Sequence, residues 1–522
     1  MKRRDLLALI GAAAGSTVMY QAMTSLGHAA ESGYGGPIKL DGNVKGASVL
    51  ILGAGLAGLV AAYELRKAGY QVKVLEYGAR AGGRSWSIRG GDRVTELGGA
   101  TQECGFDRGL YLNPGPWRIP YHHGGFIDYC RRFNVPLEAF VQLNYNAYLH
   151  SKDAFGGKPQ RYRHISSDFS GGVAELLGKA VDAGKLDDAV TKEDKEKLLE
   201  ALRQWGALDK SFAYKADDAS DRRGYEKDAG GGPDGAPTPS TPLTLSDVLK
   251  SGLWQGLSQA GRYEFQTTMF QPVGGMDRLA HALTQEVRAL VRFNAKVTAI
   301  RQDEKGVTVR YVDTKTNAAA QETAQWCLCT IPLSILRQIE MNVGPKMATA
   351  IGAVPYVPSV KVGLQMKRRF WEEDEAIYGG ITVTDLPIRN IGYPNSGFGT
   401  KGKGVLLGTY AIFQTFALEF GALDPAQRVA KAVEWGAQIH PQYRTEFENG
   451  VAVAWQRNPA SLGCFANWTD DLRKAHYADL CAIDGRILLA GEHASYIPAW
   501  QEGAILSSLS AIERLHARVV TG

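Results

Sequence analysis

Three glycines near the start of the chain have the spacing of a turn that binds a dinucleotide. Gly53, Gly55 and Gly58 form the pattern G-x-G-x-x-G between an apolar run and a helical pattern. The first glycine permits a tight turn, the second lets the backbone approach a pyrophosphate, and the third lets the helix pack closely on the strand. A second apolar run at 72–75 leads to Glu76, which is placed to bind a ribose. The pattern predicts a bound dinucleotide whose phosphates meet a helix N-terminus.

The residues after this turn indicate which dinucleotide is bound. Arg80, Gly82, Gly83 and Arg84 form the pattern R-x-G-G-R, and the segment ELGGA follows at 96–100. Together they resemble the FAD-binding motif of the flavin amine oxidase family, in which the Gly-Gly-Arg lies along the pyrophosphate. The resemblance implies FAD as the cofactor, because an NAD enzyme has no need of this second motif.

A further cofactor motif lies near the C-terminus. An apolar run ends at Gly491 and Glu492, and a helical pattern begins near Gly503. In the family that the chain resembles, this glutamate lies near the flavin pyrophosphate and ribityl chain, and Val297 matches the position whose backbone meets the adenine. The N-terminus of the predicted helix would carry about half a positive charge, which would stabilise an anionic reduced flavin.

One segment indicates a substrate with a carboxylate. The segment 115–120, GPWRIP, resembles the G-x-M-R-x-P segment of L-amino-acid oxidases, with Trp117 in place of methionine. The resemblance implies that Arg118 binds the substrate carboxylate, for which a planar and permanently charged guanidinium is well suited. Tyr393 lies in a segment that also resembles these oxidases, and we expect its hydroxyl to give the carboxylate a second hydrogen bond.

Other matched positions concern the reaction itself. Lys361 lies in an apolar, strand-like run, where burying a lysine is costly. The family keeps a lysine here, linked through water to the flavin N5, and its charge can assist the reaction with oxygen. Phe465 and Trp500 match the two aromatic positions that flank the substrate amine, and Ala499 would offer that amine a backbone carbonyl. Such rings favour the neutral, reactive amine in a slot of low dielectric constant.

Cys464 bears on how the flavin is held. In monoamine oxidases, a cysteine directly before the first of these aromatic residues carries the flavin covalently. The carboxylate-binding features favour the branch of the family with non-covalent FAD, and a covalent link through Cys464 is the alternative. The chain has six cysteines but no Cys/His cluster with zinc spacing, so no metal site is predicted.

These motifs require a split fold to bring them together. The alternating strand and helix patterns predict an α/β fold, and the resemblance to flavin amine oxidases implies the architecture of that family. It would combine a Rossmann-like FAD-binding domain in three segments, a substrate-binding domain with a mixed sheet, and a helical insertion. The expected bounds are 45–104, 271–337 and 467–522 for the FAD-binding domain, 105–160 and 338–466 for the substrate-binding domain, and 161–270 for the insertion.

Composition and the N-terminus indicate an exported, globular protein. The 522 residues are 44% hydrophobic and 22% charged, and a net charge of +5 is small enough to argue against a nucleic-acid partner. Residues 1–30 resemble a twin-arginine signal around Arg3 and Arg4, although Lys2 and Leu6 depart from its usual pattern. We expect a periplasmic or secreted protein, with a retained membrane anchor as the alternative. No other stretch is apolar and long enough to span a bilayer.

The combined features predict an exported FAD-dependent L-amino-acid oxidase, which converts an L-amino acid and O2 into a 2-oxo acid, ammonia and hydrogen peroxide. Three alternatives stay open: an amine or polyamine oxidase, a decarboxylating amino-acid 2-monooxygenase that forms an amide, and a secreted FAD-binding protein without turnover. Arg118 favours the L-amino-acid oxidase, because oxidases of simple amines need no such residue. The preferred amino acid and the possibility of a homo-oligomer are not determined by the sequence.

Overall fold

A five-stranded parallel sheet is built from three widely separated stretches of the chain. The computed structural model describes residues 32–186, 191–259, 261–412 and 414–521. The strand order is β12-β2-β1-β16-β23, and every neighbouring pair is parallel. These strands are β1 (Ser48–Leu52), β2 (Gln71–Leu75), β12 (Val291–Arg292), β16 (Trp326–Cys329) and β23 (Ile487–Leu489). The prediction of a Rossmann-like domain in three segments is therefore confirmed.

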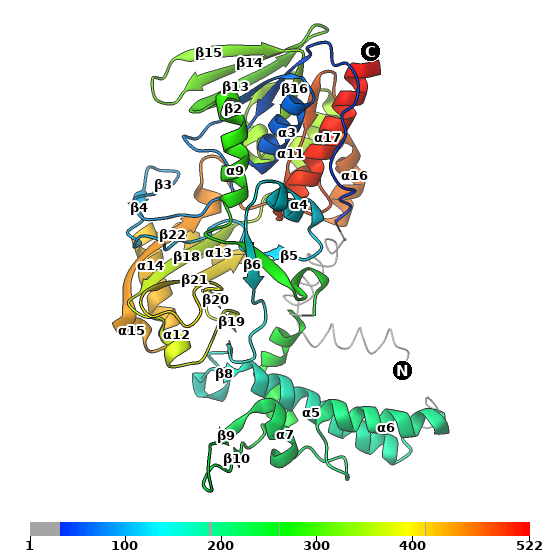
Figure 1. Cartoon of the computed structure of the whole chain (residues 1–522), viewed down its shortest axis with the longest axis vertical. Helices are drawn as coiled ribbons and strands as arrows, with labels where there is room; N and C mark the ends of the chain where they lie inside the picture. Colours follow the sequence, from blue (N-terminus) through cyan, green and yellow to red (C-terminus); the bar gives the residue numbers. More distant parts are fainter. Residues whose placement is uncertain (1–31, 187–190, 260, 413, 522) are drawn as a thin grey trace.

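Both faces of this sheet are buried along β1, β16 and β23, which explains why these three strands are largely apolar. Val49 and Ile51 belong to one core cluster, together with residues of helices α3 (Leu56–Lys67), α9 (Arg278–Val287) and α17 (Gln501–Thr521). Figure 1 shows these three helices around the sheet. Leu50 and Leu52 belong to a second cluster on the other face. The period of two along β1 thus assigns alternate side chains to two separate cores.

The second face of the parallel sheet is covered by a four-stranded sheet in the order β15-β14-β13-β17 and by two helices. The strands are β13 (Ala295–Gln302), β14 (Val307–Asp313), β15 (Ala319–Ala324) and β17 (Glu340–Met341), and the helices are α11 (Pro345–Ala353) and α16 (Asp470–Cys481). Val297 lies on β13, so this layer reaches the cofactor region predicted from the sequence.

A seven-stranded mixed sheet forms the other main body, in the order β22-β18-β21-β20-β19-β7-β8. Strand β18 (Ser359–Met366), which lies between β22 and β21, is buried along its whole length and carries Lys361. The other strands are β7 (Tyr148–His150), β8 (Gln160–Arg161), β19 (Ile381–Thr384), β20 (Asn390–Gly392), β21 (Gly404–Ile412) and β22 (Phe447–Ala454). Helices α13 (Gln414–Ala422) and α14 (Pro425–Gly436) contact β18 and β21.

The expected helical insertion extends away from both bodies, as Figure 1 shows. It contains α5 (Tyr162–Asp182), α6 (Lys192–Gly206), α7 (Ala216–Arg223) and α8 (Leu245–Ser251). A buried ion pair fixes its base: Arg223 Nε lies 3.0 Å from Asp168 Oδ1, and the backbone N–H of Leu243 donates to the same carboxylate. The insertion is therefore tied together at the end that meets the rest of the molecule.

Smaller elements complete the fold. They are β3 (Arg93–Thr95), β4 (Thr101–Glu103), β5 (Ile119–Pro120), α4 (Gly124–Arg132), β6 (Leu137–Phe140), β9 (Tyr225–Lys227), β10 (Thr238–Pro239), β11 (Met269–Pro272), α10 (Leu333–Leu336), α12 (Phe370–Glu373), α15 (Tyr443–Glu446) and the 3-10 turns at 155–157, 253–259, 263–265, 288–290, 455–457 and 492–494. The predicted signal at 1–30 lies outside the described residues. Among the described helices, none combines the length and apolar character needed to cross a membrane.

Candidate active site

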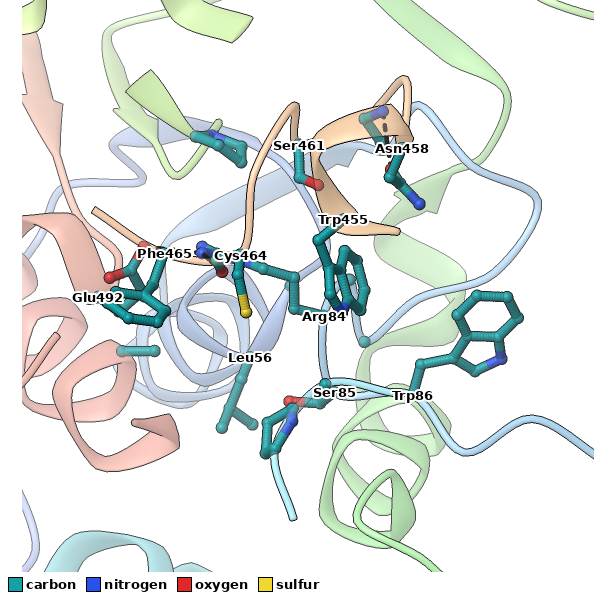
Figure 2. Close-up of a pocket in the computed structure, with 18 of the residues that line it drawn as sticks. Leu56, Arg84, Ser85, Trp86, Trp455, Asn458, Ser461, Cys464, Phe465 and Glu492 are labelled. Atoms are coloured by element: carbon teal, nitrogen blue, oxygen red, sulfur yellow. Dashed lines mark hydrogen bonds and ion pairs between the residues drawn. The ribbon is translucent and has the colours of Figure 1, made fainter. Parts of the chain in front are cut away.

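A cavity of about 1390 Å³ lies where the parallel sheet, the mixed sheet and the end of the insertion meet. Residues of the glycine-rich turn line it, as do residues of the predicted carboxylate-binding segment and of the C-terminal motif. All of the predicted site residues line this cavity except Gly58, Lys361 and Tyr393. In Figure 2, Arg84, Cys464, Phe465 and Glu492 lie together in its wall.

The three glycines of the turn serve three different purposes. Gly53 has a φ of +99°, which L side chains rarely adopt. A Cβ at Gly58 would lie 2.0 Å from the carbonyl oxygen of Gly53, so this glycine allows α3 to approach β1 closely. A Cβ at Gly55 would meet no atom within 4 Å, and Gly55 lines the cavity. The position of Gly58 outside the cavity thus agrees with a packing role.

The N-terminus of α3 is open to an anion. Its N-cap residue is Gly55, no side chain caps it, and its first turn contains no acidic residue. Free N–H groups and the helix dipole therefore face the cavity, which is the arrangement that binds phosphate. Together with the cavity volume, this open helix end shows that the residues present fit a dinucleotide such as FAD.

Glu76 supports the same turn from the end of β2. One oxygen of its carboxylate accepts a hydrogen bond from Ala54 N at 2.6 Å, and the other accepts one from Gly78 N at 2.7 Å. Burial raises the pKa of this carboxyl, and the two backbone hydrogen bonds oppose that rise. Each oxygen can still accept a second hydrogen bond, as a ribose would require.

Two arginines of the R-x-G-G-R motif are held in different ways. Arg84 Nη1 donates to Glu492 Oε1 at 2.7 Å and to the carbonyl oxygen of Cys464 at 2.8 Å. The Glu492 carboxylate also accepts weaker bonds from the backbone N–H groups of Ala466 and Ala499, at 3.3 Å each. Arg80 lies 4.2 Å from the centre of the Trp86 ring, and burial lowers its pKa to about 10. The pair of Arg84 and Glu492 therefore joins the first and last cofactor motifs directly.

The remaining predicted cofactor residues also lie in the cavity wall. Val297 is almost completely buried on β13, and Gly491 follows β23 with a φ of +136°. Gly83 follows the glycine turn with a φ of +54°, which also favours glycine. Each contributes mainly backbone to the surface on which a dinucleotide would lie.

Arg118 is a half-buried cation that forms no ion pair, although the charge of Glu264 acts on it from a distance. Its guanidinium lies 4.5, 5.1 and 6.0 Å from the ring centres of Phe265, Trp117 and Phe140. It forms no ion pair with any described carboxylate, and its Nε is buried without a hydrogen-bond partner. Burial lowers its pKa to about 10, so it stays charged at neutral pH. An unpaired charge in an aromatic environment is costly, and a substrate carboxylate would relieve that cost.

The structure corrects the prediction for Tyr393. Its side chain is 1% exposed, and its hydroxyl forms hydrogen bonds with Thr382 Oγ1 at 2.7 Å and with His440 Nε2 at 2.6 Å. It therefore belongs to the core of the mixed sheet. Tyr410 lines the cavity instead, on β21 directly opposite Lys361 of β18. The tyrosine before Pro394 resembled the expected motif, and sequence reasoning missed Tyr410, whose direction depends on the pairing of β21 with β18.

Lys361 lies directly behind the cavity wall. Its Nζ donates to the carbonyl oxygens of Gly115 at 2.6 Å and Asn113 at 3.3 Å, and it lies 4.4 Å from the centre of the Tyr410 ring. Burial lowers the pKa of Lys361 to about 7. Its amine therefore changes charge near neutral pH, one residue layer from the space where substrate and cofactor would meet.

The opposite part of the cavity has aromatic walls. Phe465 and Trp500 both line it, and Trp500 packs edge-on against His123 with ring centres 5.0 Å apart. Ala499 adopts a φ of +69°, and its N–H points to Glu492 at 3.3 Å. Sequence reasoning missed His123, which is fully buried and supports Trp500 from behind.

Cys464 lines the cavity between Arg84 and Phe465, and burial raises the pKa of its thiol. All six cysteines are free thiols in the structure. Within the described ranges, no group of three or more His, Cys, Asp or Glu side chains is arranged to hold a metal ion.

Comparison with known proteins defines the class of this enzyme. The profile of the flavin containing amine oxidoreductase family matches residues 56–516, and the chain belongs to this family. Membership implies FAD as the cofactor and makes the protein a flavin-dependent oxidase.

Particular relatives narrow the comparison. An L-amino-acid oxidase of Bothrops pauloensis is 31% identical over 476 residues, which cover 89% of this chain and 88% of the relative. An L-amino-acid oxidase of Gloydius blomhoffii is also 31% identical over 476 residues, with the same coverage. Among solved structures, a triple mutant of putrescine oxidase matches with a TM-score of 0.58 and 18% identity, covering 90% of this chain and 99% of that one. The last similarity shows the shared fold alone.

Proposed function

We propose that this enzyme is an exported L-amino-acid oxidase that binds FAD without a covalent bond. The observation that carries the proposal is Arg118, a half-buried cation without an ion-pair partner, whose Nε is buried without a hydrogen bond, in the same cavity as the open end of α3. A substrate without a carboxylate would leave this charge uncompensated. The L-amino-acid oxidases among the relatives support the same substrate class.

Different side chains of the cavity would bind the substrate, exclude water and assist the reaction with oxygen. Arg118 would hold the carboxylate, and the aromatic surfaces of Phe465 and Trp500 would exclude water and favour the neutral amine. FAD held by these residues would supply the two-electron chemistry, in which a hydride is lost from the α-carbon and O2 takes up two electrons and two protons to give hydrogen peroxide. The imino acid formed adds water and releases ammonia, which leaves the 2-oxo acid. A protonated Lys361 would favour the reaction with oxygen by its charge.

Export is proposed from Arg3 and Arg4 in the segment 1–30. A twin-arginine route carries folded proteins, which suits an enzyme whose cofactor site joins distant stretches of the chain. Fractionation of cells expressing the full chain tests this part: the Arg3→Lys, Arg4→Lys double variant should stay inside the cell while the unchanged protein leaves it.

The substrate class is tested with the purified holoenzyme and the Arg118→Ala variant. We expect peroxide and ammonia in equal amounts from at least one standard L-amino acid. In the variant, kcat/KM should fall at least about thirtyfold, since losing one partner of a buried charge pair costs 2 kcal/mol or more. The control is Arg93→Ala, which removes an exposed arginine that also lines the cavity and should retain activity.

The other functions predict different results in the same assay. Peroxide from polyamines, unchanged by Arg118→Ala, would identify an amine oxidase. Release of carbon dioxide and an amide without ammonia would identify a monooxygenase. If no amino acid or amine bleaches the flavin absorbance anaerobically, the protein has no such turnover.

A further inference from the structure

At Gly392, the last residue of β20, the structure leaves no room for a side chain. It does not adopt a positive φ, so its backbone conformation is open to any residue. A Cβ at this position would lie 2.3 Å from Trp117 Cζ2 and 2.6 Å from Trp117 Cη2. Such contacts are too short for real atoms, and a glycine in a strand often marks a close approach of this kind. The indole of Trp117 therefore occupies the space that a side chain at 392 would need.

The indole is confined on its other sides as well. Its ring packs edge-on against Phe140 and Tyr410, with ring centres 5.3 and 5.9 Å apart. Gly392 is paired with Leu407 of the neighbouring strand, and the Leu407 Cβ would lie 3.3 Å from a Cβ at 392. A shift of the strand would disturb its pairing with β21, and a shift of the ring would disturb its contacts with Phe140 and Tyr410.

Trp117 separates two hollows. It lines the main cavity, and it also lines a hollow of about 100 Å³ whose wall includes Gly392, Asn395 and Leu407. The next residue in the chain is Arg118, whose guanidinium lies 5.1 Å from the indole ring. The indole of Trp117 thus separates the two hollows, and it does so beside Arg118, which is expected to bind the substrate carboxylate.

We propose that Trp117, accommodated by Gly392, is a specificity-determining residue that closes the substrate cavity from the hollow behind it and so limits the size of the amino-acid side chain. This inference rests on the proposed function, because it assumes that the carboxylate binds at Arg118. Without the indole, the two hollows would join and admit a bulkier substrate.

The first experiment compares kcat/KM for L-tryptophan with kcat/KM for L-leucine. In Trp117→Ala, we expect the ratio to rise about tenfold or more, because changes of a few atoms in a pocket alter discrimination on this scale. Trp117→Met is the second variant, should the alanine variant fold poorly, and it should shift the ratio in the same direction. Trp205→Ala, which removes an exposed indole on α6, should leave the ratio unchanged.

A second experiment needs no turnover. The affinities of the holoenzyme for benzoate and for 2-naphthoate are measured by the change in flavin absorbance, and the ratio should shift toward 2-naphthoate in Trp117→Ala. Gly392→Ala should lower the melting temperature, and the double variant Trp117→Ala, Gly392→Ala should lose less than the two single changes together. Gly352→Ala is the control, since a Cβ there meets nothing within 4 Å.

The results separate this inference from the proposed function. If the enzyme oxidises no L-amino acid but the ratio of the affinities for benzoate and 2-naphthoate shifts as expected, the proposed function is wrong. The inference that Trp117 limits the size of the bound ligand is then still supported. If folded Trp117→Ala changes neither ratio, or if the cost of Gly392→Ala is not relieved in the double variant, the inference is wrong.

Discussion

Two cations, the buried Lys361 and the half-buried Arg118, lie near the substrate end of the cavity, and they differ in how their charge responds to pH. Arg118 keeps its charge across the physiological range although burial lowers its pKa to about 10. Lys361 has a pKa lowered to about 7 and is bound to two carbonyl oxygens. No described carboxylate forms an ion pair with either of them. One permanent charge and one switchable charge suit a site that binds a carboxylate and then transfers electrons to oxygen.

The pKa of Lys361 predicts how the reaction with oxygen depends on pH. Lys361 is protonated below pH 7 and loses its charge as the pH rises through about 7. The rate at which O2 reoxidises the reduced enzyme should therefore fall between pH 6 and 9. In Lys361→Met the rate at pH 6 should drop about tenfold or more, and the pH dependence should disappear. Stopped-flow mixing of anaerobically reduced enzyme with O2 measures both effects.

A surface lysine provides the control for this prediction. Lys367 is exposed and donates to the carbonyl oxygen of Thr445, so Lys367→Met should keep the pH profile of the unchanged enzyme. A Lys361→Met variant that still slows with rising pH would show that another group is responsible.

At the scale of elements, the sequence predicted best where backbone geometry restricts the residue type. The turn of Gly53, Gly55 and Gly58 could be recognised because a tight bend, a close approach of the backbone to a pyrophosphate and a closely packed helix each need a glycine. Tyr393 was misplaced because a strand position needs the register of neighbouring strands to say which way a side chain points. Tyr410 faces the cavity because β21 pairs with β18 in a register that only the folded sheet reveals.

The packing of α3 on β1 leads to a second prediction. Gly58→Ala places a Cβ 2.0 Å from the Gly53 carbonyl oxygen, so the helix must move away from the strand. The free energy of unfolding should fall by about 1–3 kcal/mol, and the FAD content of the purified protein should fall with it. Thermal melting and the ratio of absorbance at 450 and 280 nm (about the flavin and protein maxima) measure the two effects.

A glycine without close neighbours shows whether the effect is specific. Gly352 lies in α11 with no atom within 4 Å of a Cβ position, and alanine is the better helix former there. Gly352→Ala should keep or slightly raise stability. Equal losses in both variants would contradict the packing argument for Gly58.

For the whole molecule, cofactor binding and folding are linked because the FAD site draws on all three stretches of the sheet. Acid precipitation should release the flavin and leave a colourless pellet, which is the result for non-covalent FAD. The FAD-free protein should also melt at a lower temperature, since a ligand at a hundred times its Kd adds about 2.7 kcal/mol of stability. Cys464→Ser should still bind FAD. A yellow pellet from the unchanged protein and a colourless one from Cys464→Ser would establish the covalent link instead.

The ion pair of Arg84 and Glu492 also has a consequence for the timing of synthesis. The two residues are 408 positions apart, and they meet in the wall of the cavity. At about 5–20 residues per second, a ribosome needs roughly 20–80 seconds to travel that distance. The glycine-rich turn is made early, but the FAD site stays incomplete until β23 and Glu492 have been synthesised. FAD can therefore stabilise the fold only after that point.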